Sequence, residues 1–305
     1  MNLSIIVPSL NSSIIDQVII ALQNQTAHTQ ISEIIVVGQD QLKRLQSITG
    51  ITFIETPKPI SAAAARNLGA RHATGEWLLF TDADCIATPD WATHMLTCFA
   101  HGHTVVGGGV NIASESSTYW TLCDNLLTLT TSLESTSAMW YLPSLNFGIR
   151  RALFLALGGF DETFPGAAGE DVDFSLRLQQ HGERLHFEPA AQITHRPART
   201  TARAMWWHLW AFGAAHDRIQ QKHGDRRSSP LNHIAPRWYW AIALASPLLA
   251  ANDVRVLFAN SKSARQHPRA SFGLWWGKLG WYVGLIHAMK QRAAQTHTNR
   301  LGDRA

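Results

Sequence analysis

The chain reads Trp77-Leu78-Leu79-Phe80-Thr81-Asp82-Ala83-Asp84 at the point that decides its fold. Four apolar residues are followed at once by two carboxylates, which predicts a buried β-strand that ends on acidic side chains. Such an end, at the open edge of a sheet, is where α/β proteins commonly hold a metal or a ligand. Carboxylate oxygens suit Mg²⁺ or Mn²⁺, and these cations suit nucleotide phosphates. The alternative is an ordinary strand-to-helix turn, with Asp84 near the N-terminus of the next helix.

Apolar runs and helical patterns alternate on both sides of this stretch. Strands are predicted over residues 4–7, 33–37, 52–55, 77–80 and 104–107, and helices over 12–23, 61–73 and 90–100. This alternation predicts an α/β fold with a mainly parallel sheet and helices on both faces. The glycines at 107–109 lack the spacing and the following helix of a dinucleotide-binding fingerprint.

Length and cysteine usage limit the class of protein. A chain of 305 residues can form one large α/β domain with an appendage. Cys85, Cys98 and Cys123 show no paired short spacing, which argues against a disulfide framework or a structural zinc site. The first strand begins just after Met1, without the length and basic flank of a secretory signal. We therefore expect a cytoplasmic protein.

Charge divides the chain into two parts. Residues 1–195 carry nine Lys or Arg against 18 Asp or Glu, a balance of −9, whereas residues 196–305 carry 17 against four, a balance of +13. The second part also holds eight of the 12 tryptophans. A basic, Trp-rich segment predicts attraction to anionic lipid headgroups. Nucleic acid is the rival partner, but we expect no nucleic-acid binding because the chain has no recognised motif for it.

Several short motifs give the chain a family resemblance. They are Ile5-Ile6-Val7-Pro8-Ser9-Leu10-Asn11, Ala65-Arg66-Asn67-Leu68-Gly69-Ala70, the stretch from Gly75 to Asp84, Gly158-Gly159-Phe160-Asp161-Glu162 and Gly169-Glu170-Asp171-Val172-Asp173-Phe174. In this order and spacing they resemble the inverting family-2 glycosyltransferases of the GT-A fold, over about residues 1–200. The resemblance implies sugar transfer from a nucleotide-diphosphate sugar to a hydroxyl of a glycan or lipid-linked acceptor, as in polysaccharide or glycolipid synthesis.

The resemblance also implies a metal site and a catalytic base. By the family's pattern Asp84 binds a divalent cation, Mn²⁺ or Mg²⁺, Asp82 contacts the ribose or the metal, and His195 is a further ligand. The family's Glu-Asp pair maps to Glu170 and Asp171, and Asp171 is the base we expect to deprotonate the acceptor. Outside this motif the pair would be ordinary charges at a helix N-terminus, and His195 a polar surface residue.

The nucleotide is expected at the ends of the first two strands. Pro8, Ser9 and Asn11 would approach the base and ribose, largely through backbone groups. Arg66 and Asn67 belong to the family's Ala-Arg-Asn-x-Gly motif, whose arginine lies near the diphosphate. Outside the motif, Arg66 would be a solvated helix residue.

One position departs from the family. After the second strand relatives usually have an Asp that reads the nucleobase edge, whereas Gly38 stands here. We therefore expect Gln39 or Asp40 to recognise the base. A small-residue turn that lines the donor sugar in relatives is expected near Asn146.

The basic tail contains two apolar segments, at 238–251 and 272–289. Charged residues interrupt them before they can span about 30 Å of hydrocarbon, so we expect interfacial or hairpin helices on a membrane. A helical subdomain packed on the catalytic domain is the alternative. We predict a GT-A domain over 1–200 and a basic, Trp-rich, amphipathic helical tail over 201–305, peripheral on the cytoplasmic face of the membrane.

Two rival functions remain. One is a non-catalytic relative that binds a nucleotide-sugar or a partner, and the intact Asp84 and Asp171 speak against it. The other is a nucleotidyltransferase, which normally has a Gly-rich, basic phosphate loop near the first strand. Residues 9–13 contain neither Gly nor Lys, which argues against a nucleotidyltransferase.

Overall fold

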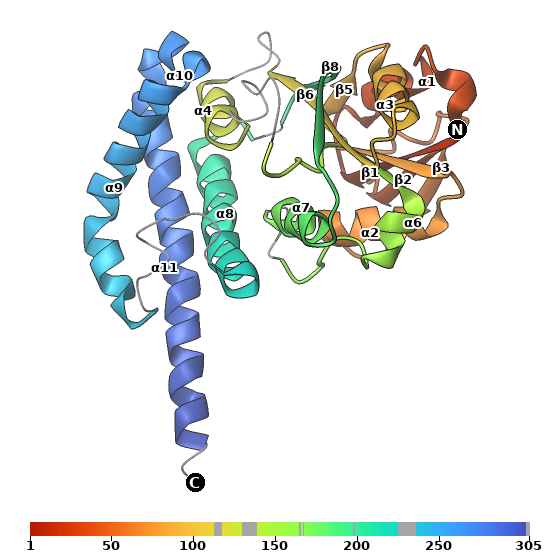
Figure 1. Ribbon diagram of the computed structural model, residues 1–305. Helices are drawn as coiled ribbons and strands as arrows, with labels where there is room; N and C mark the ends of the chain where they lie inside the picture. The colour runs from red at the N-terminus through yellow and green to blue at the C-terminus, as the bar shows by residue number, and fades with distance from the viewer. Residues whose placement is uncertain are drawn as a thin grey trace. The chain divides into compact units, whose positions relative to one another are not determined.

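The chain forms two compact units, drawn in Figure 1. A computed structural model describes residues 1–112, 118–129, 139–164, 166, 168–197, 199–224 and 236–302, with the backbone alone beyond residue 295. Unit 1 comprises Met1–Ser117, Thr131–Thr163 and Glu170–Ala198, and unit 2 comprises Thr118–Thr130, Phe164–Gly169 and Arg199–Ala305.

Unit 1 is built on an eight-stranded sheet. In sheet order the strands are β3 (Thr52–Glu55), β2 (Ile31–Gln39), β1 (Leu3–Leu10), β4 (Trp77–Thr81), β7 (Asn146–Arg150), β6 (Val105–Ile112), β8 (His186–His195) and β5 (Cys85–Ala87). The first four run parallel, as do β6 and β8. Strand β7 is antiparallel to both of its neighbours, and β5 is antiparallel to β8. The predicted α/β class is confirmed, with a mixed second half of the sheet.

Helices cover both faces of this sheet. They are α1 (Ile15–Gln23), α2 (Ala62–His72), α3 (Trp91–Ala100), α6 (Arg151–Ala156) and α7 (Glu170–Gln180). On the central strand β4, Phe80 packs against Phe154 of α6, in the core that also holds Phe174 of α7. Trp77, on the opposite face of β4, stacks on Phe99 of α3 with ring centroids 4.0 Å apart. Because side chains alternate along a strand and both faces are covered, β4 reads as a continuous apolar run.

Two strands of unit 1 differ from the sequence expectation. Residues 146–150, near which a small-residue turn was expected, form strand β7 between β4 and β6. The three-residue strand β5 directly follows Asp84 and pairs with the end of β8. Neither strand has a long apolar run of its own, so the local sequence does not predict it. Each strand forms through pairing with strands that are distant in the sequence.

Unit 2 is helical. Its helices are α4 (Tyr119–Thr128), α8 (Ala202–His223), α9 (Tyr239–Asn260), α10 (Lys262–Gln266) and α11 (Ser271–Gly302). Helices α8 and α11 approach so closely that a Cβ on Gly213 would lie 1.8 Å from the carbonyl oxygen of Trp281. A Cβ on Gly284 would likewise lie 1.9 Å from that of Trp210. Glycine at these two positions therefore permits the helix contact.

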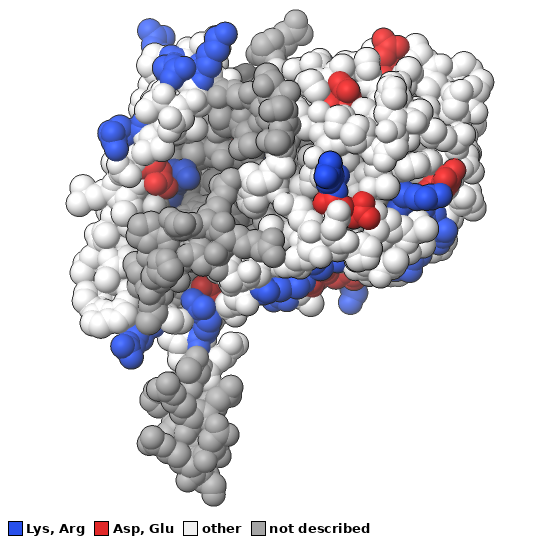
Figure 2. Space-filling model, viewed as in Figure 1, with Lys and Arg blue, Asp and Glu red and all other residues white. Residues whose placement is uncertain are grey.

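Helix α9 has apolar residues on two sides. Ile242 and Ala250 are buried in a cluster with residues of α11. Trp240, Leu244 and Leu248 follow one another at four-residue spacing and are exposed, both leucines at 77%. Figure 2 shows the outer edge of α9 as white, with Lys and Arg side chains towards both ends. This outward stripe leaves apolar surface on unit 2.

The helical segment Pro236–Asn260 continues beyond the expected apolar segment, which ended at residue 251. Its 25 residues are long and apolar enough to cross a membrane by length and composition alone. A core helix of a soluble protein can meet the same test, although only 22% of the most apolar window is buried here.

Candidate active site

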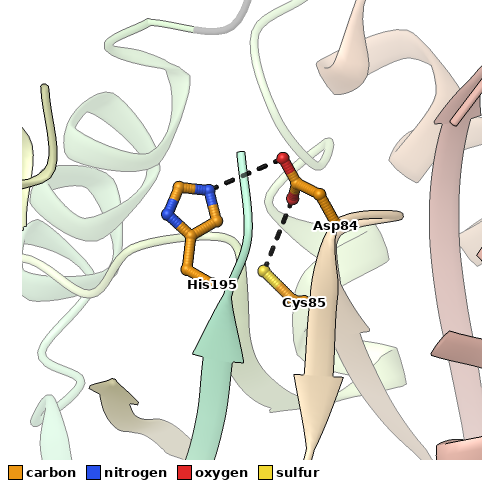
Figure 3. Close-up of side chains that lie close together, drawn as sticks. All are labelled: Asp84, Cys85 and His195. Atoms are coloured by element: carbon orange, nitrogen blue, oxygen red, sulfur yellow. Dashed lines mark hydrogen bonds and ion pairs between the residues drawn. The ribbon is translucent and has the colours of Figure 1, made fainter. Parts of the chain in front are cut away.

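The two carboxylates after β4 lie at the carboxyl edge of the sheet. The backbone N–H of Cys85 donates to the carbonyl of Asp82, which turns the chain into β5. Strand β5 pairs with β8 so that Cys85 stands opposite His195. This pairing places His195 Nε2 3.6 Å from Asp84 Oδ2, as Figure 3 shows. The predicted residues Asp84 and His195 thus meet, although 110 residues separate them.

Asp84, Cys85 and His195 form a group that could hold a cation. Their possible ligand atoms lie within 4.8 Å of one another. A carboxylate oxygen and an imidazole nitrogen are suitable ligands for Mn²⁺ and related cations. Burial, and then the charges of Asp84 and Asp82, raise the pKa of the Cys85 thiol well above its usual value. The Cys85 Sγ lies 3.6 Å from Asp84 Oδ1.

Arg66 links the carboxylate edge to helix α7. Its Nη2 lies 2.6 Å from Asp82 Oδ1 and its Nη1 3.1 Å from Glu170 Oε1. The guanidinium side chain is only 2% exposed. The expectation from the family placed this arginine near a diphosphate, whereas the structure pairs it with two carboxylates of the chain. Arg66 therefore positions Asp82 and Glu170 relative to each other.

Asn67, the next residue on α2, faces the segment before α7. Its Nδ2 donates to the carbonyl of Phe160 at 2.7 Å and to Glu162 at 2.9 Å. Its Oδ1 accepts from the Phe160 N–H at 2.9 Å. These hydrogen bonds give Asn67 a structural role in the motif, because they join helix α2 to the segment before α7.

Glu170 and Asp171 begin helix α7. Burial, and then the charge of Asp171, raise the pKa of Glu170 to about 7, although Arg66 opposes the shift. Within the described residues the second oxygen of Glu170, Oε2, is buried without a hydrogen-bond partner. Burial also raises the pKa of Asp171, against the lowering effect of N–H groups including that of Val172, 2.8 Å from Oδ1. Both carboxyls therefore hold a proton more readily than ordinary surface acids.

The ends of β1 and β2 present unpaired polar atoms. Among the residues that the structure describes, Ser9 Oγ, Gln39 Oε1 and Thr56 Oγ1 are buried and lack a hydrogen-bond partner. Gln39 Nε2 donates to the carbonyl of Thr56 at 3.3 Å, which brings two of them together. Buried polar atoms normally have hydrogen-bond partners, so these three atoms are candidates to bind the polar groups of a ligand. The preceding residue Pro8 is only partly buried.

Asn11 and Asp40 shape the loop after β2. The Asn11 side chain accepts from the Gln41 N–H at 2.8 Å, and its φ of 55° is left-handed. Both oxygens of Asp40 accept backbone N–H groups, from Arg44 at 3.0 Å and from Leu45 at 2.7 Å. The carboxylate of Asp40 is thus used within its own loop, whereas Gln39 Oε1 has no hydrogen-bond partner among the residues that the structure describes.

Gly38 has a steric reason for lacking a side chain. Its φ is 138°, and a Cβ there would lie 1.9 Å from the carbonyl oxygen of Ser9 on the neighbouring strand. Any other residue would clash with β1 or force the strands apart. The departure from the family's Asp therefore follows from the close approach of β1 and β2.

Sequence reasoning did not single out two residues that lie in this candidate site, and the structure gives Asn146 contacts that were not expected. Thr56 and Cys85 were not candidates, although each directly follows a predicted strand or motif residue. Asn146 was expected near the donor sugar, but its Oδ1 accepts from Trp91 Nε1 and its Nδ2 donates to the carbonyls of Gly109 and Ala191. It ties β7 to α3, β6 and β8, because a buried amide must satisfy both of its ends.

The chain belongs to glycosyl transferase family 2, whose model matches residues 4–163. A pre-mycofactocin glycosyltransferase of Mycobacterium tuberculosis is 28% identical over 190 residues, which cover 59% of this chain and 39% of that protein. The inactive polypeptide N-acetylgalactosaminyltransferase-like protein 5 of Macaca fascicularis is 25% identical over 211 residues, which cover 59% of this chain and 48% of that protein. The chain thus spans less than half the length of these two relatives.

The fold has a counterpart among solved structures. A mannosyltransferase of Pyrobaculum calidifontis, in complex with GDP-Man and Mn²⁺, superposes with a TM-score of 0.59. The match covers 90% of this chain and 85% of that one, at 19% sequence identity. The likeness supports the GT-A architecture expected from the motifs.

Proposed function

We propose that the chain is a metal-dependent inverting glycosyltransferase that moves a sugar from a nucleotide-diphosphate sugar to a hydroxyl of a glycan or lipid-linked acceptor. The observation that carries this proposal is the buried series of contacts Asp82–Arg66–Glu170. It joins the carboxylate edge of the sheet to the start of α7, so that metal-binding and base candidates belong to one site. Family membership and the solved mannosyltransferase with Mn²⁺ support the same chemistry.

Asp84 and His195 fit a divalent cation by the chemistry of their donor atoms, and Asp82 lies two residues before Asp84 in the chain. A cation held there would supply Lewis-acid stabilisation of the negative charge that grows on the diphosphate leaving group. Arg66 keeps Asp82 in place through its 2.6 Å ion pair. His195 is held by the strand pairing of β5 and β8.

Asp171 is the proposed general base. Its raised pKa brings its basicity closer to that needed to accept a proton from an acceptor hydroxyl. Asp171 is partly exposed, whereas Glu170 is buried and paired with Arg66. We assign recognition of the nucleotide to the polar atoms of Ser9, Gln39 and Thr56, with Pro8 and Asn11 shaping the loop. Glu170, whose pKa is raised by burial and by the charge of Asp171, is the alternative base.

Donor binding and chemistry can be tested on the full chain. A panel of nucleotide-diphosphate sugars with different bases is mixed with the protein and Mn²⁺, and the Tm and the release of sugar are measured. We expect one donor class to raise the Tm, because a ligand that binds only the folded state stabilises it. Asp84→Asn should remove this Mn²⁺-dependent shift, whereas the surface variant Asp90→Asn should keep it. The proposal fails if no donor raises the Tm, or if Asp84→Asn leaves the shift intact.

A non-catalytic role is the second candidate, favoured by the similarity to a relative named inactive. It predicts a donor-dependent Tm shift without sugar transfer or donor hydrolysis. An enzyme should instead turn the donor over at a rate that Asp171→Asn lowers. The same panel therefore separates the two functions.

We further propose that unit 2 attaches the protein to an anionic membrane surface. The outward stripe of Trp240, Leu244 and Leu248 supplies apolar contact. Lys262 and Arg265 are exposed beyond the end of α9, and the balance of residues 196–305 is +13. Apolar insertion and attraction to anionic headgroups should add, each basic residue near the surface contributing about 1 kcal/mol. The site of action would be the cytoplasmic face of the cell membrane.

A further inference from the structure

Unit 1 contains a second group of metal-ligating side chains, at the C-terminus of α3. Cys98, His186 and Glu188 offer possible ligand atoms within 4.8 Å of one another. Cys98 Sγ lies 3.6 Å from Glu188 Oε2. We propose that these three residues bind a zinc-class divalent cation, with a fourth position open to water.

Local structure explains why these residues converge. His186 and Glu188 are two positions apart on β8, so their side chains share one face of the sheet, and α3 packs on β8. The helix ends with Gly102 at a φ of 89°, and the His103 N–H donates to the carbonyl of Cys98 at 3.1 Å. This left-handed glycine cap folds the chain back over the last turn of α3.

The cap also brings a second imidazole to the group. The ring of His103 stacks on that of His186, with centroids 3.7 Å apart and an angle of 12° between the planes. A stacked neighbour limits the rotation of His186 and so reduces the ordering that metal binding requires. His103 is thus a positioning residue in this proposal rather than a ligand.

The donor set suits zinc better than the cation expected at the active site. Thiolate sulfur and imidazole nitrogen are typical ligands of Zn²⁺, and a carboxylate can complete three protein ligands with water as the fourth. Cys98 is 4% exposed, whereas His186 and Glu188 are partly exposed, which leaves a route for a cation. Burial, and then the charge of Glu188, raise the pKa of Cys98 to about 12. A bound cation takes the place of the thiol proton, which leaves to solvent, and lies between the Cys98 sulfur and the Glu188 carboxylate.

This group is separate from the candidate active site. His186 is the first residue of β8 and His195 the last. His186 pairs with Val106 and His195 with Ile112, six positions apart on β6, so at about 3.3 Å per residue the two histidines are about 20 Å apart. A cation at Cys98 would join α3 to β8 and stabilise unit 1 without entering the sugar-transfer chemistry.

Cobalt provides a spectroscopic test, because Co²⁺ substitutes for Zn²⁺ and shows a charge-transfer absorption when bound by a thiolate. Full-length, tag-free protein is titrated with Co²⁺. We expect this absorption to saturate at one Co²⁺ per chain and to disappear when Zn²⁺ is added. Cys98→Ser should abolish it, whereas Cys123→Ser and Cys85→Ser should keep it. Histidines elsewhere on the surface cannot produce a thiolate absorption.

Two results would overturn the proposal. One is a wild-type protein without a thiolate absorption in excess Co²⁺. The other is an absorption that Cys85→Ser removes and Cys98→Ser keeps, which would assign the metal to Asp84, Cys85 and His195. Should Cys98→Ser fail to fold, Glu188→Gln gives the test: we expect its Co²⁺ affinity to fall at least tenfold, and an unchanged affinity contradicts the site. None of these results depends on donor binding.

Discussion

Glu170 in unit 1 and Asp124 in unit 2 are both buried carboxyls beside an arginine, yet their pKa values move in opposite directions. Burial alone would raise the pKa of Asp124, but His208 and Arg199 outweigh it and lower that pKa. Their nitrogens lie 2.6 and 2.9 Å from its two oxygens. Glu170 has one ion-paired oxygen, one buried oxygen without a partner among the described residues, and the charge of Asp171 nearby.

The difference separates a carboxylate with both oxygens paired from one whose second oxygen has no hydrogen-bond partner among the described residues. Asp124 has a donor on each oxygen and ties α4 to α8 within unit 2. Glu170 is under-satisfied, and a strongly shifted carboxyl beside a charge partner is typical of a reactive site. The shifted carboxyl of Glu170 thus stands where chemistry is proposed, whereas the Asp124 carboxylate is paired with His208 and Arg199.

The largest expected effect comes from Arg66, which supports both Asp82 and Glu170. Arg66→Met leaves a buried carboxylate without its cation, so we expect a loss of about 3–5 kcal/mol of unfolding free energy. The exposed pair of Arg44 and Asp16, 3.3 Å apart, is the matched control. Arg44→Met should cost only about 0–1 kcal/mol. Urea unfolding followed by circular dichroism measures both unfolding free energies. Equal losses in the two variants would show that the ion pairs of Arg66 stabilise the fold no more than the exposed pair of Arg44 and Asp16.

Asp171→Asn separates chemistry from binding. The amide preserves shape but cannot accept the proton, so kcat should fall on the order of 10²-fold or more while the donor-induced Tm shift persists. Glu170→Gln is the comparison, and it should reduce kcat less. If Glu170→Gln removes turnover while Asp171→Asn keeps it, the base is Glu170.

The pH dependence of stability should differ in sign between the two carboxyls. Glu170 has its folded pKa raised to about 7, so its contribution is present below its ordinary value of 4.5 and is lost as the pH rises through 7. Asp124 has a lowered folded pKa, so its contribution is present above its ordinary value of 3.8 and is lost as the pH falls further.

Unfolding free energies measured across this pH range check the two signs. Glu170→Gln should remove a slope of up to about 1.4 kcal/mol per pH unit between pH 4.5 and 7. Asp124→Asn should instead reduce the loss of stability on the acid side of pH 4. The comparison breaks if Glu170→Gln leaves the slope between pH 4.5 and 7 unchanged, or if Asp124→Asn changes the curve there rather than below pH 4.

The smallest effect on stability is expected on the outer side of α9. Leu244→Ser with Leu248→Ser should change the unfolding free energy by no more than about 0.5 kcal/mol per site, because both side chains are already exposed. The same variant should bind anionic liposomes more weakly in a flotation assay. Ile20→Ser, at an exposed apolar position of unit 1, is the control and should not change binding. Wild-type protein that ignores anionic liposomes contradicts membrane attachment.

Local sequence pattern was sufficient to predict most of the strands and helices of unit 1. Strand β3 was predicted at its observed bounds, and α2 and β4 within one residue, because apolar periodicity and turn residues are local signals. The order of short motifs was sufficient for the family, since it fixes which residue types end which strands. The carboxylates Asp82 and Asp84 therefore followed from the sequence by itself.

Contacts between residues far apart in the sequence decided the remaining features of unit 1. The contacts of Arg66 and Asn146 and the short strands β5 and β7 depend on residues far along the chain. The spacing of the cysteines argued against structural zinc, yet Cys98 and Glu188, 90 residues apart, lie together because α3 packs on β8. Spacing reveals ligands only when they share a short segment. Sequence pattern thus determined which groups stand at the carboxyl edge of the sheet, whereas tertiary packing decided which of them are paired, buried and shifted in pKa, because burial and charge partners exist only after the elements assemble.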